Sequence, residues 1–332
     1  MNVVVIGLGS MGRRRIRLMK TLNSELEIRG VDLSSERQKQ AKEELGIESY
    51  SELKEAIMDF RPDCAFICTS PISHGAIALE CLNSGLNIFT EINLLSDWYK
   101  KAMEISRKNG AKIFLSSTFL YRKEIQYIEH FVNNEVVNYI YHTGQYLPDW
   151  HPWESYKNFF VSNPKTNGCR EIFGIELPWI VKVFGEIVNF NVLKSKISNL
   201  ELNYNDNYMV MFEHKNGTKG VMCVDVVSRK AVRNLEIYSE NKHLFWDGSP
   251  SGLKKYNFET KTLDNIELYE NIVKDSKYSS SIIENAYSDE IREFFEVING
   301  EKSTSCHSLE NDKNILELID RIEGVNDRGI NE

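Results

Sequence analysis

The feature that most constrains the fold of this chain is a glycine-rich turn near the N-terminus. Residues 2–6 are a short apolar run typical of a buried strand, and the sequence Gly-Leu-Gly-Ser-Met-Gly follows directly at 7–12. In a G-x-G-x-x-G turn, the first glycine makes the tight turn, the second lets the backbone approach a pyrophosphate, and the third lets helix and strand pack closely. The phosphates then lie at the positive N-terminus of the next helix. We therefore predict a dinucleotide site formed by Gly7, Gly9, Ser10, Met11 and Gly12.

An acidic residue stands where such a site would need one. Asp32 follows a second apolar segment, 26–31, and lies twenty residues past Gly12. A carboxylate there accepts hydrogen bonds from the adenine ribose and repels a 2′-phosphate, which favours NAD. NADP stays an alternative, because three arginines follow the turn at 13–15. We expect Arg14 and Arg15 on a solvated helix face, and Arg13 within reach of the adenosine end.

Strands and helices alternate through the first 120 residues. Further apolar strands are predicted at 64–68, 86–90 and 111–116, with helices at 34–45, 51–60, 72–84 and 96–109. This alternation indicates an N-terminal doubly wound parallel sheet, a Rossmann domain spanning 1–120. Ligands of such sheets bind at the carboxyl ends of the strands. Cofactor contacts are therefore also expected from Thr69, Ser70, His74 and Glu91, although a satisfied surface histidine is the alternative for His74.

From residue 121 the pattern changes to long alternating segments with few helices. Strands are predicted at 139–146, 187–196, 207–213, 218–227, 232–238 and 243–246, and Asn216-Gly217 is a strong hairpin signal. Amphipathic helices are predicted at 122–133, 285–299 and 308–322. We expect a C-terminal α+β domain, 121–332, with a large, mostly antiparallel open sheet. Helices or a partner subunit would have to cover its faces.

The most unusual stretch is an aromatic, polar segment with two prolines at 146–156. Aromatic faces beside hydrogen-bonding groups suit a sugar or polyol ring, and loops on a rigid scaffold often carry function. We expect Asp149, Trp153 and Tyr156 to contact substrate. The alternatives are a loop that packs on its own rings, or a subunit contact.

Composition excludes several other classes of protein. The net charge of −8 argues against nonspecific nucleic-acid binding, and no apolar run approaches the roughly 18 residues needed to span a bilayer. The first residues lead directly into a strand, so we expect no signal peptide and a cytoplasmic protein. The six cysteines lack the spacing of a zinc site, and we expect reduced thiols and no metal.

Taken together, these motifs resemble the Gfo/Idh/MocA family of oxidoreductases. The matching stretches are 7–12, Asp32, 69–71 with His74, 89–91, 119–122, 184–186 and 287–300. The resemblance implies NAD(P) and hydride transfer at a carbon of a sugar, sugar nucleotide or inositol. It also implies a homodimer or homotetramer formed through the sheet of the second domain.

The chain departs from the family pattern at two positions. Ile92 stands where the family usually has the lysine of Glu-Lys-Pro, and Ile175 stands where it often has the histidine of Asp-x-x-x-His. Glu91 still matches the glutamate, as a cofactor-side contact, and Glu171 matches the aspartate.

The proton of the substrate hydroxyl therefore needs another acceptor. His151 is the first candidate, with a packing histidine as the alternative, and Glu171 and Glu176 come next. Arg122 is expected either to hold an anionic substrate group or to cap a helix. Two other functions stay open. One is an NAD-retaining lyase, epimerase or glycosidase-type enzyme, and the other is a non-catalytic nucleotide-binding pseudoenzyme.

Overall fold

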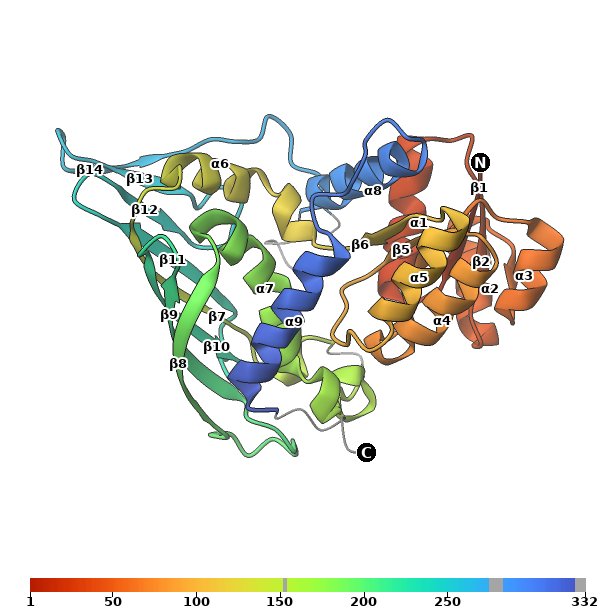
Figure 1. The fold of residues 1–332 in the computed structure, drawn as a ribbon, viewed down its shortest axis with the longest axis horizontal. Coiled ribbons are helices and arrows are strands. Elements are labelled where there is room, and N and C mark those ends of the chain that lie inside the picture. The colour runs from red at the N-terminus through yellow and green to blue at the C-terminus, as the bar shows by residue number, and fades with distance from the viewer. Residues whose placement is uncertain (152–153, 275–282, 326–332) are drawn as a thin grey trace. The chain divides into compact units, whose positions relative to one another are not determined.

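The computed structural model describes residues 1–151, 154–274 and 283–325, and the chain divides into two compact units (Figure 1). The first unit contains Met1–Thr118 and Tyr287–Leu316, and the second contains Phe119–Ala286 and the chain from Glu317 onward. Each unit is built around one sheet.

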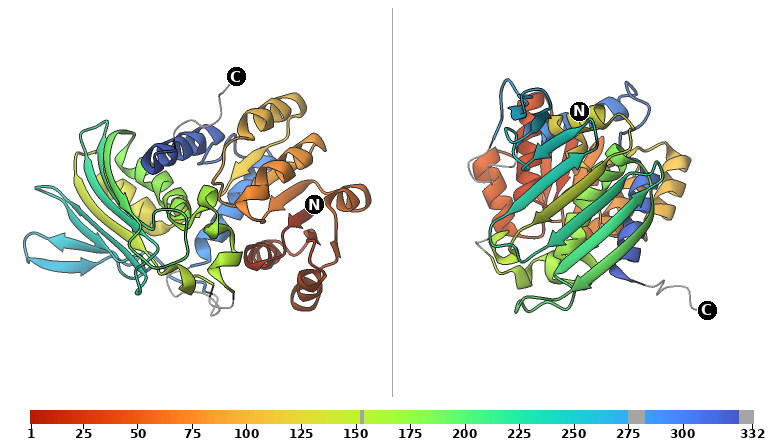
Figure 2. Two further views of the ribbon diagram at one scale, coloured as in Figure 1. Left: turned by 90° about the horizontal axis from the view of Figure 1, so that it is seen from below. Right: turned by 90° about the vertical axis from the view of Figure 1, so that its left-hand side faces the viewer.

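The first unit has a six-stranded sheet in the order β3-β2-β1-β4-β5-β6, in which all pairs are parallel. Its strands are β1 (Asn2–Ile6), β2 (Glu27–Val31), β3 (Ser49–Tyr50), β4 (Cys64–Ile67), β5 (Asn87–Thr90) and β6 (Ile113–Leu115). Helices lie on both faces of this sheet (Figure 2, left). They are α1 (Ser10–Leu22), α2 (Ser35–Leu45), α3 (Leu53–Phe60), α4 (Pro71–Asn83), α5 (Tyr99–Asn109) and α8 (Asn285–Ile298) from residue 287 on. The predicted doubly wound parallel sheet is confirmed.

The C-terminal tail corrects the predicted domain organisation. Residues 287–316 belong to the first unit, whereas the sequence placed the whole tail in the second domain. The reason is an aromatic cluster: the Phe294 ring packs edge-on against Phe66, Phe89 and Phe114, with centroids 5.0–5.7 Å apart. Such contacts between residues about 200 positions apart leave no local pattern in the sequence.

The second unit has an eight-stranded sheet in the order β14-β13-β12-β11-β7-β10-β9-β8. Its strands are β7 (Asn138–Gly144), β8 (Ile187–Ser195), β9 (Asn207–His214), β10 (Lys219–Asp225), β11 (Val232–Tyr238), β12 (His243–Trp246), β13 (Lys254–Asn257) and β14 (Thr262–Asn265). Only the β7–β10 pair is parallel. The predicted mostly antiparallel sheet is therefore confirmed, and so is its hairpin, because His214 N donates to Thr218 O at 2.9 Å and Gly217 has φ +94°.

The sequence did not predict the helix that covers the inner face of this sheet. Helix α7 (Gly168–Phe184) is buried on nearly all sides, so it has no amphipathic stripe, and Pro178 interrupts its helical pattern. Helix α6 (Lys123–Val132) and the last turns of α9 (Leu309–Glu323) belong to the same unit. Short 3₁₀ turns, η1 to η5, cover Thr118–Tyr121, Leu147–Asp149, Tyr156–Asn158, Phe160–Ser162 and Pro164–Thr166.

The outer face of the second sheet carries apolar side chains in contact with solvent. In the described residues no helix covers this face (Figure 2, right). Leu193, Met209, Met211, Ile140 and Val221 lie on β7 to β10 and are 38–76% exposed. An apolar patch of this kind marks an interaction surface on a folded protein. No helix of the described residues is long and apolar enough to cross a membrane.

Candidate functional site

The glycine turn has the geometry that a pyrophosphate site requires. Gly7 has φ +92° and donates from its N–H to Val31 O at 2.8 Å, which fixes the turn against β2. A Cβ added at Gly12 would lie 1.9 Å from Gly7 O, so helix α1 packs against the turn as only glycine permits. A Cβ at Gly9 would meet nothing within 4 Å. The backbone at Gly9 is therefore open to a ligand, and the residues present fit a dinucleotide.

Asp32 is tied to the same turn. Its Oδ2 accepts a hydrogen bond from Leu8 N at 2.8 Å, and its Oδ1 accepts one from Ser34 N at 2.9 Å. Each oxygen keeps a second lone pair, so the carboxylate is fixed and still able to accept from a ribose hydroxyl. That role stays a prediction. Arg13, which we expected within reach of the adenosine end, donates to Gln40 Oε1 of α2 at 2.6 Å.

His74, on α4, is buried and not a surface histidine. Its Nε2 lies 2.9 Å from Thr69 O, and its Nδ1 lies 3.0 Å from Asn93 Oδ1 as assigned. Burial lowers the pKa of His74, so the ring is neutral, donates from Nε2 and accepts at Nδ1. Exchanging the amide oxygen and nitrogen of Asn93 satisfies this arrangement. The ring thus holds the loop containing Thr69 and Ser70, while direct contact of these residues with the cofactor stays a prediction.

The prediction that Arg14 and Arg15 face solvent is wrong, because the two side chains are 4% and 0% exposed. Arg15 donates from Nε to Glu91 Oε1 at 2.6 Å and from Nη2 to Glu290 Oε2 at 2.7 Å. Glu290 lies on α8, the helix whose position the sequence missed, and it also accepts from Ser117 N at 2.7 Å. Glu91, which the sequence places on the cofactor side, is therefore held by the buried side chain of Arg15.

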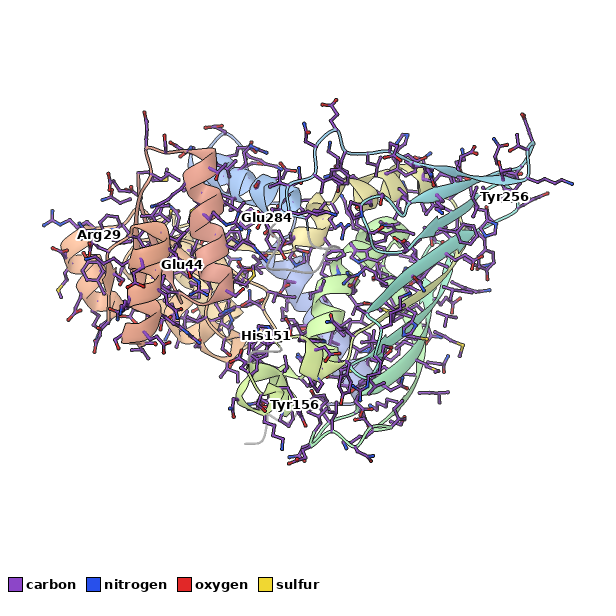
Figure 3. The ribbon with its side chains drawn as sticks, turned by 180° about the vertical axis from the view of Figure 1, so that it is seen from behind. Arg29, Glu44, His151, Tyr156, Tyr256 and Glu284 are labelled. Atoms are coloured by element: carbon purple, nitrogen blue, oxygen red, sulfur yellow. The ribbon has the colours of Figure 1, made fainter. Side chains whose placement is uncertain are left out.

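In the second unit, the aromatic segment precedes α7 and carries His151 and Tyr156 (Figure 3). His151 Nδ1 lies 3.3 Å from Glu154 Oε1, and its ring lies 4.3 Å from that of Phe159. Partial burial lowers the pKa of His151, which leaves the ring neutral and able to accept a proton. The hydroxyl of Tyr156 accepts from Glu201 N at 3.1 Å, and Asp149 is exposed. Trp153 lies outside the described residues.

The two glutamates of α7 differ in their surroundings. Glu176 is fully buried; its Oε1 accepts from Arg233, and its Oε2 accepts from the Tyr141 hydroxyl and the Trp179 indole, each at 2.7 Å. In contrast, Glu171 Oε2 is buried and accepts no hydrogen bond from the described residues. Burial raises the pKa of Glu171 to about 8. Glu171 therefore carries a proton at neutral pH, whereas Glu176 is a fully paired carboxylate.

Arg122 lies at the start of α6 and is 4% exposed. It donates from Nη2 to Glu124 Oε1 at 2.6 Å and to Gly248 O at 3.2 Å. Arg122 is the N-cap residue of α6, but its side chain makes no capping hydrogen bond, so the guanidinium is fixed by Glu124 and Gly248 and does not cap the helix. A contact with substrate stays a prediction. Sequence reasoning missed Arg233, a single arginine on β11 with no motif around it. In the part of the chain that the structure describes, no cluster of three or more His, Cys, Asp or Glu side chains could hold a metal ion.

Comparison with known proteins agrees with this geometry. Residues 1–115 match the GFO_IDH_MocA family model, described as an oxidoreductase family with an NAD-binding Rossmann fold. The predicted family resemblance and the predicted cofactor, NAD, are confirmed by this match. A curated relative, myo-inositol 2-dehydrogenase of Thermotoga maritima, is 28% identical over 92 residues. The match spans 27% of this chain and only 28% of that relative.

Solved structures resemble the whole chain. An oxidoreductase from Agrobacterium radiobacter, in complex with NAD+, L-tartaric acid and magnesium, matches with a TM-score of 0.80 and 13% identity, over 99% of this chain and 97% of that one. Myo-inositol 2-dehydrogenase from Lactobacillus plantarum matches with a TM-score of 0.77 and 16% identity, over 98% and 96%. At these identities the likeness shows a shared fold.

Proposed function

We propose that this member of the Gfo/Idh/MocA oxidoreductase family is an NAD-dependent dehydrogenase or reductase acting on a CH–OH group. The substrate class that we propose is a sugar, sugar nucleotide or inositol-like compound. The observation that carries the proposal is the turn at Gly7 to Gly12, where Gly9 is open to a ligand and Gly12 admits no side chain. The substrate class rests on the relatives, which include inositol dehydrogenases.

The proposed reaction needs a group that exchanges a proton with the substrate hydroxyl. NAD held at the turn of Gly7 to Gly12 would supply the hydride acceptor for the alcohol carbon, and the protein would have to accept the hydroxyl proton. We assign that proton to His151, which is neutral because burial lowers its pKa. Glu171, protonated near neutral pH, is the second candidate and suits proton donation in the reductive direction. Glu176 is the weakest candidate, because both of its oxygens already accept hydrogen bonds from Arg233, Tyr141 and Trp179.

We propose that the remaining substrate contacts come from Asp149, Trp153 and Tyr156, which flank His151 in the sequence. For Arg122 a structural role has the stronger support, since its guanidinium is paired with Glu124.

We further propose a homodimer or homotetramer formed through the outer face of the second sheet. Support comes from Leu193, Met209 and Met211, which are 51–76% exposed on adjacent strands. Covering them removes apolar surface from water at roughly 25 cal/mol per Å². All six cysteines are free thiols, which suits a reducing compartment such as the cytoplasm.

The test is a titration of the purified protein with NADH and with NADPH, followed by nicotinamide fluorescence and repeated with Asp32→Ala. We expect preference for NADH in the wild type and loss of that preference in the variant. Absence of binding by either nucleotide, in protein whose acid extract contains no nucleotide, would contradict the proposal. Arg13→Ala, in the first turn of α1, is the control, because its side chain is bound to Gln40 of α2.

A second candidate keeps NAD but changes the reaction. In it, the substrate is oxidised and then reduced by bound NAD within one cycle. Such a lyase, epimerase or glycosidase would copurify with NAD and make no net NADH. The third alternative is a non-catalytic pseudoenzyme, and its support is that Ile92 and Ile175 replace the two residues that handle the proton in the family pattern. The dehydrogenase accumulates NADH with its substrate, and a pseudoenzyme changes no substrate.

A further inference from the structure

An arginine occupies an inward-facing position on β11. Side chains of a strand alternate between its faces, so Arg233 shares a face with Leu235 and Ile237, which are both buried. A guanidinium in such a place needs a partner, and Glu176 provides one. The side chain of Glu176 is 0% exposed, but that of Arg233 keeps 24% exposure. Only the Arg233 side of this ion pair therefore reaches solvent.

One edge of the guanidinium is fixed by its contacts. Nε and Nη2 donate to Glu176 Oε1 at 3.1 and 2.7 Å, and Nε also lies 3.2 Å from the Tyr141 hydroxyl. The guanidinium plane lies over the Phe119 ring, with 4.6 Å from Cζ to the centroid. The side chain has thus already lost the rotamer freedom that a ligand would otherwise have to remove.

The other edge remains available. No acceptor among the described residues receives a hydrogen bond from Nη1 of Arg233. Glu176 is also shared, because its Oε2 accepts from Tyr141 and Trp179. The carboxylate therefore meets the guanidinium through Oε1 alone, at Nε and Nη2, and leaves Nη1 uncovered. A planar fork with free donors matches the oxygens of a carboxylate or a phosphate.

The neighbouring residues are also basic. Arg229 and Lys230 are exposed and precede Arg233 in a segment, 229–233, that contains no carboxylate, although the whole chain has a net charge of −8. The Arg229 guanidinium lies 3.7 Å above the Tyr146 ring, and Tyr146 N donates to Ser228 O at 2.7 Å. The basic segment thus adjoins the start of the aromatic segment.

We propose that Arg233 binds an anionic group of the substrate, a carboxylate or a phosphate, on the inner face of the second sheet. This inference rests on the proposed oxidoreductase function and narrows its substrate to anionic sugar derivatives. Arg233 is then a specificity-determining residue, and Glu176 is a positioning residue that holds it.

The test uses inorganic phosphate as the probe. The full chain is first saturated with NAD, so that phosphate cannot occupy the pyrophosphate site, and is then titrated with phosphate by calorimetry. We expect saturable binding in the wild type and at least tenfold weaker binding in Arg233→Met. Arg321→Met is the matched control, because Arg321 also lies over a ring, that of Phe190 at 5.1 Å, and should leave binding unchanged. Equal affinity in the wild type and Arg233→Met, or no saturable binding in the wild type, would overturn the proposal.

Two further variants separate binding from folding. Arg233→Met leaves Glu176 as a buried unpaired charge, which is strongly destabilising. The double variant Arg233→Met/Glu176→Gln removes both charges and should weaken phosphate binding like the single variant. Glu176→Gln alone keeps an amide oxygen that can still accept from Nε and Nη2, and so still positions Arg233, but it removes the competing negative charge. It should therefore bind phosphate at least as tightly as the wild type. A folded double variant with wild-type affinity, or weaker binding in Glu176→Gln, contradicts the inference.

Failure of the proposed function and failure of this inference can be told apart. If the chain fails to bind NADH, the oxidoreductase proposal fails, and the same titrations without nucleotide still decide whether Arg233 binds an anion.

Discussion

Replacing Glu171 with glutamine should stabilise the protein by an amount that grows with pH. The Glu171 carboxyl, whose Oε2 is buried, has a pKa raised from 4.5 to about 8 by loss of hydration. Because the folded state holds this proton more tightly than the unfolded state, the carboxyl favours folding fully below pH 4.5. That contribution is lost as the pH rises toward 8. One pKa unit corresponds to about 1.4 kcal/mol, so the wild type loses at most about 5 kcal/mol over this range.

The measurement is the free energy of unfolding in urea at pH 5 and pH 7, followed by tryptophan fluorescence. Between these pH values the difference between Glu171→Gln and wild type should increase by at most about 2.7 kcal/mol, and by at least 1 kcal/mol. Comparing two pH values removes the constant cost of burying the glutamine amide. The control is Glu186→Gln, whose carboxylate is 66% exposed, and its effect should be equal at both pH values. A difference for Glu171→Gln that does not change with pH would refute the argument that loss of hydration at Oε2, which has no hydrogen-bond partner among the described residues, raises the pKa of this carboxyl.

Three further predictions concern the nucleotide turn, the outer sheet face and the proton acceptor. Gly12→Ala should lower both the melting temperature and NADH affinity, because its Cβ would lie 1.9 Å from a backbone oxygen. Gly9→Ala should lower only NADH affinity, because its Cβ would meet no protein atom within 4 Å. Calorimetry measures the melting temperature, and fluorescence titration measures the affinity for NADH. Met211→Glu should convert the oligomer to monomers in light-scattering chromatography, while Met58→Glu, also on an exposed methionine, should not. His151→Ala should abolish turnover with NADH affinity unchanged, and full turnover in that variant would remove His151 from the proposed mechanism.

The sequence by itself determined those features that depend on neighbours along the chain. The turn at 7–12, its flanking strand and helix, and the Asn216-Gly217 hairpin follow from steric and hydrogen-bonding rules that act within a few residues. Likewise, the alternation of strands and helices before residue 120 predicts the parallel sheet, because parallel strands need crossover connections.

Other features were decided only by tertiary structure. Helix α7 is buried on nearly all sides, so no periodicity marked it, and the sequence could not show that Glu176 is paired while Glu171 is not. The burial of Arg15 depends on a carboxylate 275 residues away, and the partly open guanidinium of Arg233 depends on a glutamate 57 residues away. The charge state of a side chain is set by what lies within a few ångströms of it in space. Long-range packing therefore decides which of the polar residues in this chain are paired and which remain available for chemistry.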